Sequence, residues 1–402
     1  MRLTRRMLLA TAASVAIARA GTAAEAIRIG LSGPFTGGSA CMGVCMRNGV
    51  RIAVAEINQA GGVLGRPILL IERDDKADTG LAGRIAQELI NEQRVAATLG
   101  FINTPVALTT QRTYQDAAIP VITNVATGTL IARRFRPPEY QANFIFRTAA
   151  NDAIQSAMIV DEAISRRGFR QPAILADATA YGQLGREDLE RALASKGVPP
   201  VAEEKFNIGD TDMTSQLLRA KRAQADVLLT YGIGPELAQI ANGMARLGWK
   251  LPMIGSWTLS MTTFIDAAGA NGDGATMPQT FIQAPSTPKR GAFIAAYQNA
   301  TGLDRIPSPV SAAQGYDSAL LLAAAIAQAG STDGNQIRAA LENLRTTVEG
   351  VVTIYDKPFS ATDHEAITPN IPVFGVVKGG RVVAAYPADI EAANAVRVKT
   401  RS

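Results

Sequence analysis

Short apolar runs alternate with amphipathic segments along most of the chain. In its first part the strand-like apolar runs lie at positions 27–31, 67–72, 95–99 and 119–122. The intervening segments 46–60, 79–93 and 105–117 repeat apolar residues every three or four positions, which predicts helices with one buried face. Strict alternation of strand and helix is typical of a parallel sheet covered by helices on both faces.

A second series of the same kind follows. Its predicted strands lie at 172–175, 201–206, 227–230 and 253–254, and its predicted helices at 152–167, 183–196, 213–223 and 235–247. Segment 142–147 is either a further strand or a crossing segment. We therefore predict an α/β protein with two doubly wound parallel sheets.

The C-terminal portion is too short for a third domain. It contains predicted helices at 288–301, 314–329 and 334–344, a strand at 351–355, and a hairpin of 374–377 with 381–384. We expect these elements to complete the two preceding α/β units.

Residues 1–24 read as an export signal and not as part of the fold. They carry four arginines and no acid, and they contain an uncharged run at 7–18 that is too short to span a bilayer. The pattern Thr4-Arg5-Arg6 resembles a twin-arginine signal, and an ordinary secretory signal with paired arginines remains the alternative. Both place the mature protein in the periplasm, with cleavage expected after Ala20 or Ala24.

Composition and charge exclude several classes of function. The chain has 402 residues, of which 47% are hydrophobic and 19% charged, so it is long enough for two globular domains. Removing the four leader arginines lowers the net charge from +5 to +1, which leaves no overall field to attract nucleic acid. No later segment predicts a membrane span, and the Ala/Leu-rich stretch 319–329 is typical of a core helix.

The motifs of common enzymes and metal sites are absent from the sequence. Residues 32–38 do not have the glycine spacing of a dinucleotide-binding loop, and neither a Walker sequence nor a Gly-x-Ser-x-Gly elbow occurs. Cys41 and Cys45 have only one histidine, the distant His364, to complete a zinc site. They form either a local disulfide or two small apolar side chains in a glycine-rich loop. We expect no enzyme activity, cofactor or metal.

Small polar residues follow two successive strands, at 100–104 and at 123–127. In open parallel sheets, ligands bind just beyond the carboxyl ends of the strands. These two loops are therefore the first candidates for a ligand site. The acidic stretch 74–78 could suggest a cation site, but a solvated strand end followed by a helix cap is the preferred interpretation.

Several motifs in order resemble one family across the mature chain. They are Ile27-Arg28-Ile29-Gly30-Leu31, Gly33-Pro34, residues 55–66, Asp74-Asp75, Ala126-Thr127, Phe146-Arg147, Ala180-Tyr181-Gly182, Gly255-Ser256 and Tyr316-Asp317. This order is similar to that of the type I periplasmic solute-binding proteins of ABC transporters, in the leucine/isoleucine/valine-binding group.

The resemblance implies two lobes joined by three crossovers, which we place near Arg147, Thr280 and Pro369. Lobe one would contain residues 25–147 and 281–368, and lobe two residues 148–280 and 369–402. A small ligand would be trapped between the lobes and passed to a membrane permease. A binder of an aromatic carboxylate or short amide in the same fold, and a receptor that reports occupancy to a sensor, remain alternatives.

The resemblance also implies site residues. Thr104, Ala126 and Thr127 match the positions that hold a ligand carboxylate, with Asn103 beside them, although helix capping would also explain the two threonines. Tyr181 matches a tyrosine that closes over the ligand from lobe two.

Two positions depart from the amino-acid-binding pattern. Trp257 stands where the family has a glutamate for the ligand ammonium, and Ile233 replaces a tyrosine, although Tyr231 is close by in the sequence. Together with Met42 and Phe101 they would form a bulky apolar wall. This wall favours an aromatic or otherwise hydrophobic carboxylate, unless Asp177 or Glu236 supplies the missing acid.

Overall fold

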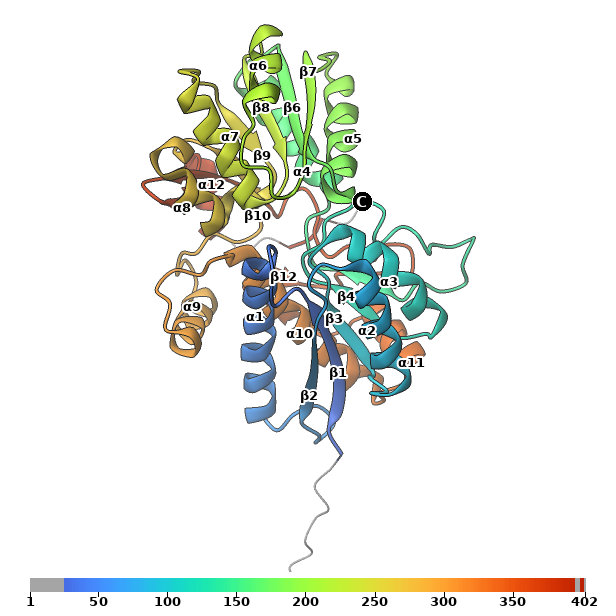
Figure 1. Ribbon diagram of the computed structural model, residues 1–402. Coiled ribbons are helices and arrows are strands. Elements are labelled where there is room, and N and C mark those ends of the chain that lie inside the picture. Colours follow the sequence, from blue (N-terminus) through green and yellow to red (C-terminus); the bar gives the residue numbers. More distant parts are fainter. Residues whose placement is uncertain (1–24, 395–397, 401–402) are drawn as a thin grey trace, which may run out of the picture.

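The computed structural model describes residues 25–394 and 398–400, so the predicted export signal lies outside the described residues. Two lobes lie one above the other (Figure 1). The lower lobe contains a parallel five-stranded sheet in the order β2-β1-β3-β4-β5. Its strands are β1 (Ile27–Gly33), β2 (Ile68–Asp74), β3 (Ala97–Gly100), β4 (Val121–Thr123) and β5 (Ile145–Arg147). Segment 142–147 thus contributes a fifth strand, because β5 pairs in parallel with β4.

Helices from both ends of the chain cover this sheet. They are α1 (Ala40–Gln59), α2 (Thr79–Asn91), α3 (Thr104–Asp116), α9 (Pro288–Thr301), α10 (Pro309–Ala329) and α11 (Gly334–Glu342). The N-terminal helices and the C-terminal α9–α11 lie in the same lobe (Figure 1). Close packing of α1 on α10 depends on Gly49, where a Cβ atom would lie 2.0 Å from the Ala312 carbonyl oxygen. Within the described residues, α10 alone has the length and composition of a membrane span, and 83% of its most apolar window is buried in the lobe.

The upper lobe contains a seven-stranded sheet in the order β14-β13-β10-β9-β8-β6-β7. Its strands are β6 (Pro172–Asp177), β7 (Ala202–Phe206), β8 (Val227–Tyr231), β9 (Met253–Gly255), β10 (Thr276–Gln279), β13 (Val373–Lys378) and β14 (Arg381–Ala384). The first five are parallel, and the hairpin β13–β14 adds to β10 in antiparallel orientation. The alternation of strands and helices therefore produces two parallel sheets, as predicted.

The helices of this lobe follow its strands. They are α4 (Asp152–Val160), continued by a π-helical turn η1 (Asp161–Arg166), then α5 (Ala180–Ser195), α6 (Thr214–Arg222), α7 (Gly234–Arg246), the 3-10 turns η2 (Trp257–Ser260) and η3 (Gly269–Gly272), α8 (Thr262–Ala268) and α12 (Pro387–Asn394). The sequence did not predict α8, β10 or α12, which are short and mixed in polarity.

Two local predictions are wrong. Helix α1 begins at Ala40 and not near position 46, so Cys41 and Cys45 lie one turn apart on a helix and are both free thiols, neither in a loop nor in a disulfide. The predicted strand 351–355 is interrupted: β11 (Val348–Glu349) pairs with β12 (Ile354–Tyr355), while the amides of Val351 and Val352 donate to the buried Asp317 carboxylate, at 2.7 and 2.9 Å. Those amides are therefore not available to a sheet.

The lobes are joined beside a buried ion pair. Arg147, at the end of β5, has no exposed side-chain surface and forms a two-point pair with Glu365, in which Nε lies 2.8 Å from Oε2. The backbone amide of Ala366 also donates to the Arg147 carbonyl. Two crossover segments more than two hundred residues apart in sequence are thus held side by side.

The substitution Glu365→Ala is expected to destabilise the protein by about 3–5 kcal/mol, because it leaves a fully buried guanidinium without its carboxylate. Glu72→Ala is the control, since Glu72 pairs with the half-exposed Arg51 and its loss should cost at most about 1 kcal/mol. Urea unfolding measures both. Equal midpoints for the two variants would contradict a structural role for the buried pair.

Candidate ligand-binding site

The loops at the carboxyl ends of the strands of both sheets face one cavity of about 310 Å³ between the lobes. Residues from both lobes line it. They are Gly38, Ser39, Met42, Lys76, Ala77, Ile102, Asn103, Thr104, Pro105, Val125 and Thr127 from lobe one, and Thr179, Tyr181, Ile208, Ile233, Pro235, Glu236, Trp257 and Thr258 from lobe two. Seven of the nine predicted site residues are in this set.

Lobe one contributes hydroxyl and amide groups from the loops after β3 and β4. Thr104 is the first residue of α3, and its hydroxyl oxygen accepts from the Gly128 amide at 3.3 Å, so its proton remains free to donate. The buried Thr127 hydroxyl has no hydrogen-bond partner among the described residues. Asn103 donates to Ser39, at 3.1 Å, and its amide oxygen is also unpartnered. Neither threonine is a helix cap, since Asn103 precedes α3 and Thr127 lies outside a helix.

Phe101 and Ala126 do not line the cavity, which corrects their expected place in the site. Gly100 and Phe101 adopt positive φ angles of 134° and 64°, and this turn directs the phenyl ring into the core against Tyr114, at a centroid distance of 5.8 Å. The Ala126 amide donates to the Phe101 carbonyl at 3.0 Å. That amide is therefore used within the protein and not offered to a ligand.

Lobe two contributes an aromatic and apolar wall. Tyr181 lies in the first turn of α5 and donates from its hydroxyl to the Ser256 hydroxyl at 2.8 Å. The Trp257 backbone amide donates to the Gln155 side chain at 3.1 Å, which holds the loop after β9 in place. Ile233 completes this wall and Met42 adds an apolar side chain from lobe one, so the predicted apolar surface forms without Phe101.

The two acids that the sequence offers as partners for a ligand ammonium differ in position. Asp177 does not line the cavity: its Oδ1 accepts from the Thr179 amide and hydroxyl and from the Gly182 amide, which fixes the start of α5. Burial raises the pKa of Asp177 to about 6. Glu236 does line the cavity, from the first turn of α7.

The acidic stretch after β2 is only partly as predicted. Asp78 caps α2 by accepting from the Leu81 amide at 2.6 Å. Asp75, however, is fully buried and not solvated: it accepts from Ser32 and from the Ala77 amide, and burial raises its pKa to about 6. Because Asp75 fixes this turn, Lys76 is placed at the cavity with a φ of 54°.

A buried acid lies directly behind the cavity. Asp152, the first residue of α4, accepts from the Tyr231 hydroxyl at 2.6 Å, and its amide donates to the Thr127 carbonyl. Burial raises the pKa of Asp152 to about 7, although the hydrogen bond from Tyr231 and the charge of Arg147 offset part of the rise. Nearby, Thr129 of lobe one donates to Asp188 of α5 at 2.7 Å, a direct bond between the lobes.

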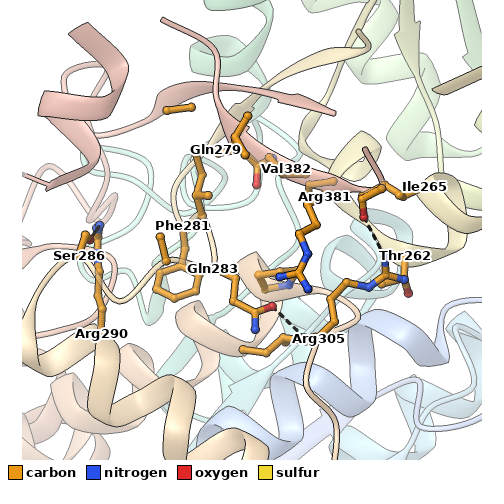
Figure 2. Close-up of a pocket in the computed structure, with 18 of the residues that line it drawn as sticks. Thr262, Ile265, Gln279, Phe281, Gln283, Ser286, Arg290, Arg305, Arg381 and Val382 are labelled. Atoms are coloured by element: carbon orange, nitrogen blue, oxygen red, sulfur yellow. Dashed lines mark hydrogen bonds between the residues drawn. The ribbon is translucent and has the colours of Figure 1, made fainter. Parts of the chain in front are cut away.

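A second cavity, of about 270 Å³, lies beside the crossover that follows β10 (Figure 2). Its lining includes Phe281, Gln283 and Arg305 but none of the predicted site residues. The Arg305 guanidinium is occupied by Asp266 and by the Gly380 carbonyl, and Gln283 accepts from the Ile306 amide. The polar groups of this cavity are thus largely committed to the fold.

Comparison with known proteins agrees with this architecture. Residues 26–381 match the family described as periplasmic binding protein. The chain is 27% identical over 336 residues to a leucine-, isoleucine-, valine-, threonine- and alanine-binding protein of Pseudomonas aeruginosa, covering 83% of this chain and 87% of that one. A type 1 periplasmic binding protein of Bordetella pertussis superposes with a TM-score of 0.79 at 26% identity, covering 89% and 99% of the two chains.

A solute-binding protein of Rhodopseudomonas palustris, solved in complex with 3,4-dihydroxybenzoic acid, has the same fold, with a TM-score of 0.76 at 23% identity over 89% and 95% of the chains. Two α/β lobes around a shared cavity define a bilobal solute-binding protein. This chain belongs to the periplasmic binding protein family, in the type I fold class, and the predicted likeness to the leucine/isoleucine/valine-binding group is confirmed.

Because Asp152 is buried, we expect the free energy of unfolding to fall as the pH rises from about 5 to about 8. Its folded-state pKa is about 7, above the ordinary value of 3.8, so between these two pH values the folded protein holds a proton that the unfolded chain has lost. In Asp152→Asn the free energy of unfolding should depend less steeply on pH. Urea titrations at pH 5, 6.5 and 8 measure the slope, with Asp304→Asn, an exposed acid, as control. A slope unchanged in Asp152→Asn would contradict this assignment.

Proposed function

We propose that this protein is the extracytoplasmic solute-binding component of an ABC importer. It traps a small carboxylate-bearing ligand between its lobes and delivers it to a membrane permease. The observation that carries the proposal is the cavity between the lobes, walled on one side by unpartnered polar groups and on the other by apolar side chains.

The lobe-one wall is suited to a carboxylate. A carboxylate that leaves water needs several hydrogen-bond donors, because its desolvation is costly. The hydroxyls of Thr104 and Thr127 can both donate, and the N-terminus of α3 opens at the same wall, where its free amides and dipole favour an anion. Lys76 adds a positive charge on the same side.

Two ligand classes fit the remaining wall. The P. aeruginosa relative is named for hydrophobic and small amino acids, which supports a branched-chain or other hydrophobic amino acid. The R. palustris protein holds an aromatic carboxylate. An aromatic carboxylate is therefore the second candidate. It is supported by Trp257, which stands in place of an acid, and by the apolar side chains of Ile233 and Met42.

The proposal also includes the location of the protein and the fate of its ligand. Family membership and the arginine-rich leader support export to the periplasm, with removal of the leader. The ligand is bound and released unchanged, without enzymatic turnover. A sensor in place of the permease would use the same closure, and neighbouring transporter or sensor genes would distinguish the two.

A thermal-shift screen with leucine, isoleucine, benzoate and 3,4-dihydroxybenzoate tests the proposal. At one hundred times its dissociation constant, a ligand should stabilise the protein by about 2.7 kcal/mol. Stabilisation by leucine but by neither aromatic acid would contradict the interpretation of Trp257. Stabilisation by no carboxylate would contradict the proposed function.

Thr127→Val should weaken binding of a carboxylate found in this screen about 10- to 100-fold, since it removes one hydrogen bond to a charged group, worth about 1.5–3 kcal/mol. Thr230→Val is the matched control: Thr230 is also buried with an unpartnered hydroxyl, but it does not line the cavity. Titration calorimetry compares the variants. Equal affinities for both would remove Thr127 from the site.

A further inference from the structure

One carboxylate oxygen at the cavity wall has no donor. The residue Glu236 is 6% exposed, and its Oε1 accepts from the Gly209 amide at 2.7 Å. Its Oε2 is buried as well, without a hydrogen-bond partner among the described residues. A buried carboxylate oxygen that loses water without gaining a donor is unfavourable, so this arrangement calls for a donor from outside the wall.

The polar neighbours on the same wall are already committed. Thr179 donates to Asp177 at 2.5 Å, Thr258 to the Gly232 carbonyl at 2.6 Å, and Tyr181 to Ser256 at 2.8 Å. Each of these hydroxyls has one proton, and each proton is in use. The described residues of lobe two that line this cavity therefore offer Glu236 no free hydroxyl.

Position 257 cannot serve as the acceptor, because a tryptophan side chain offers only a ring N–H donor. The acid at this cavity instead comes from the helix that follows β8. Glu236 lies in the first turn of α7, where the helix dipole stabilises a carboxylate without neutralising it. Of the residues that line the cavity, Lys76 is the only other ordinarily charged one, and it belongs to the opposite lobe.

We propose that Glu236 is the specificity-determining acceptor of this site, an inference that rests on the proposed function. Its free oxygen binds a hydrogen-bond donor that the ligand carries in addition to its carboxylate. The ligand class is thus a carboxylate with a second polar group, an ammonium or a hydroxyl, joined by an apolar part. The carboxylate binds lobe one, the apolar part contacts Met42, Ile233 and Trp257, and the donor reaches Glu236.

Two ligand pairs test the assignment, and the members of each pair differ by one hydrogen-bond donor. Together the pairs distinguish an ammonium donor from a hydroxyl donor. Leucine is compared with 4-methylpentanoate, which lacks the ammonium, and 4-hydroxybenzoate with benzoate, which lacks the hydroxyl. In the wild-type protein at least one donor-bearing ligand should bind at least 10-fold more tightly than its partner. In Glu236→Gln that advantage should fall below about threefold, since the amide keeps an acceptor for Gly209 but loses the charge.

The ratio of the two dissociation constants within a pair separates ligand recognition from structural effects, because a change in folding alters the binding of both members alike. Glu187→Gln, a half-exposed acid of the same lobe, is the control and should keep the wild-type ratio. Equal binding within both pairs, or a ratio unchanged in Glu236→Gln, would overturn the assignment while leaving the carboxylate site intact. Binding of none of the four ligands would contradict the proposed function itself.

Discussion

The buried guanidinium of Arg147 is the interaction on which the arrangement of the site depends. It pairs with Glu365, which joins two crossover segments, and its Nη1 donates to the Gly128 carbonyl at 2.6 Å. Gly128 in turn donates to Thr104 and directly follows Thr127. One cation therefore links the junction of the lobes to both loops of the lobe-one wall, so that the position of the ligand groups and the joint between the lobes are set together.

The two walls of the cavity are built on different principles. The lobe-one loops present hydroxyls that the fold leaves available, whereas the lobe-two hydroxyls are bonded to one another and present mainly apolar surface. A ligand that bridges the walls completes hydrogen bonds on one side and buries apolar area on the other.

Much of the fold follows from the sequence because buried parallel strands and amphipathic helices have strong periodicity, and most predicted elements differ from the structure only at their ends. Features decided by single contacts do not follow. Phe101 turns away from the cavity because of a positive φ angle, Asp75 is buried by its turn, and Asp317 takes the amides that would extend a strand. The sequence offers Glu236 only as an alternative to Asp177, because the burial of its carboxylate depends on contacts such as the one with the Gly209 amide.

A crystal structure of the protein with a carboxylate selected by the thermal-shift screen tests the central claim most directly. The account predicts density between the lobes, with the carboxylate within hydrogen-bond distance of Thr104 and Thr127 and the apolar part against Trp257. Density only in the second cavity, beside Phe281 and Arg305, or a carboxylate directed toward lobe two, would contradict it.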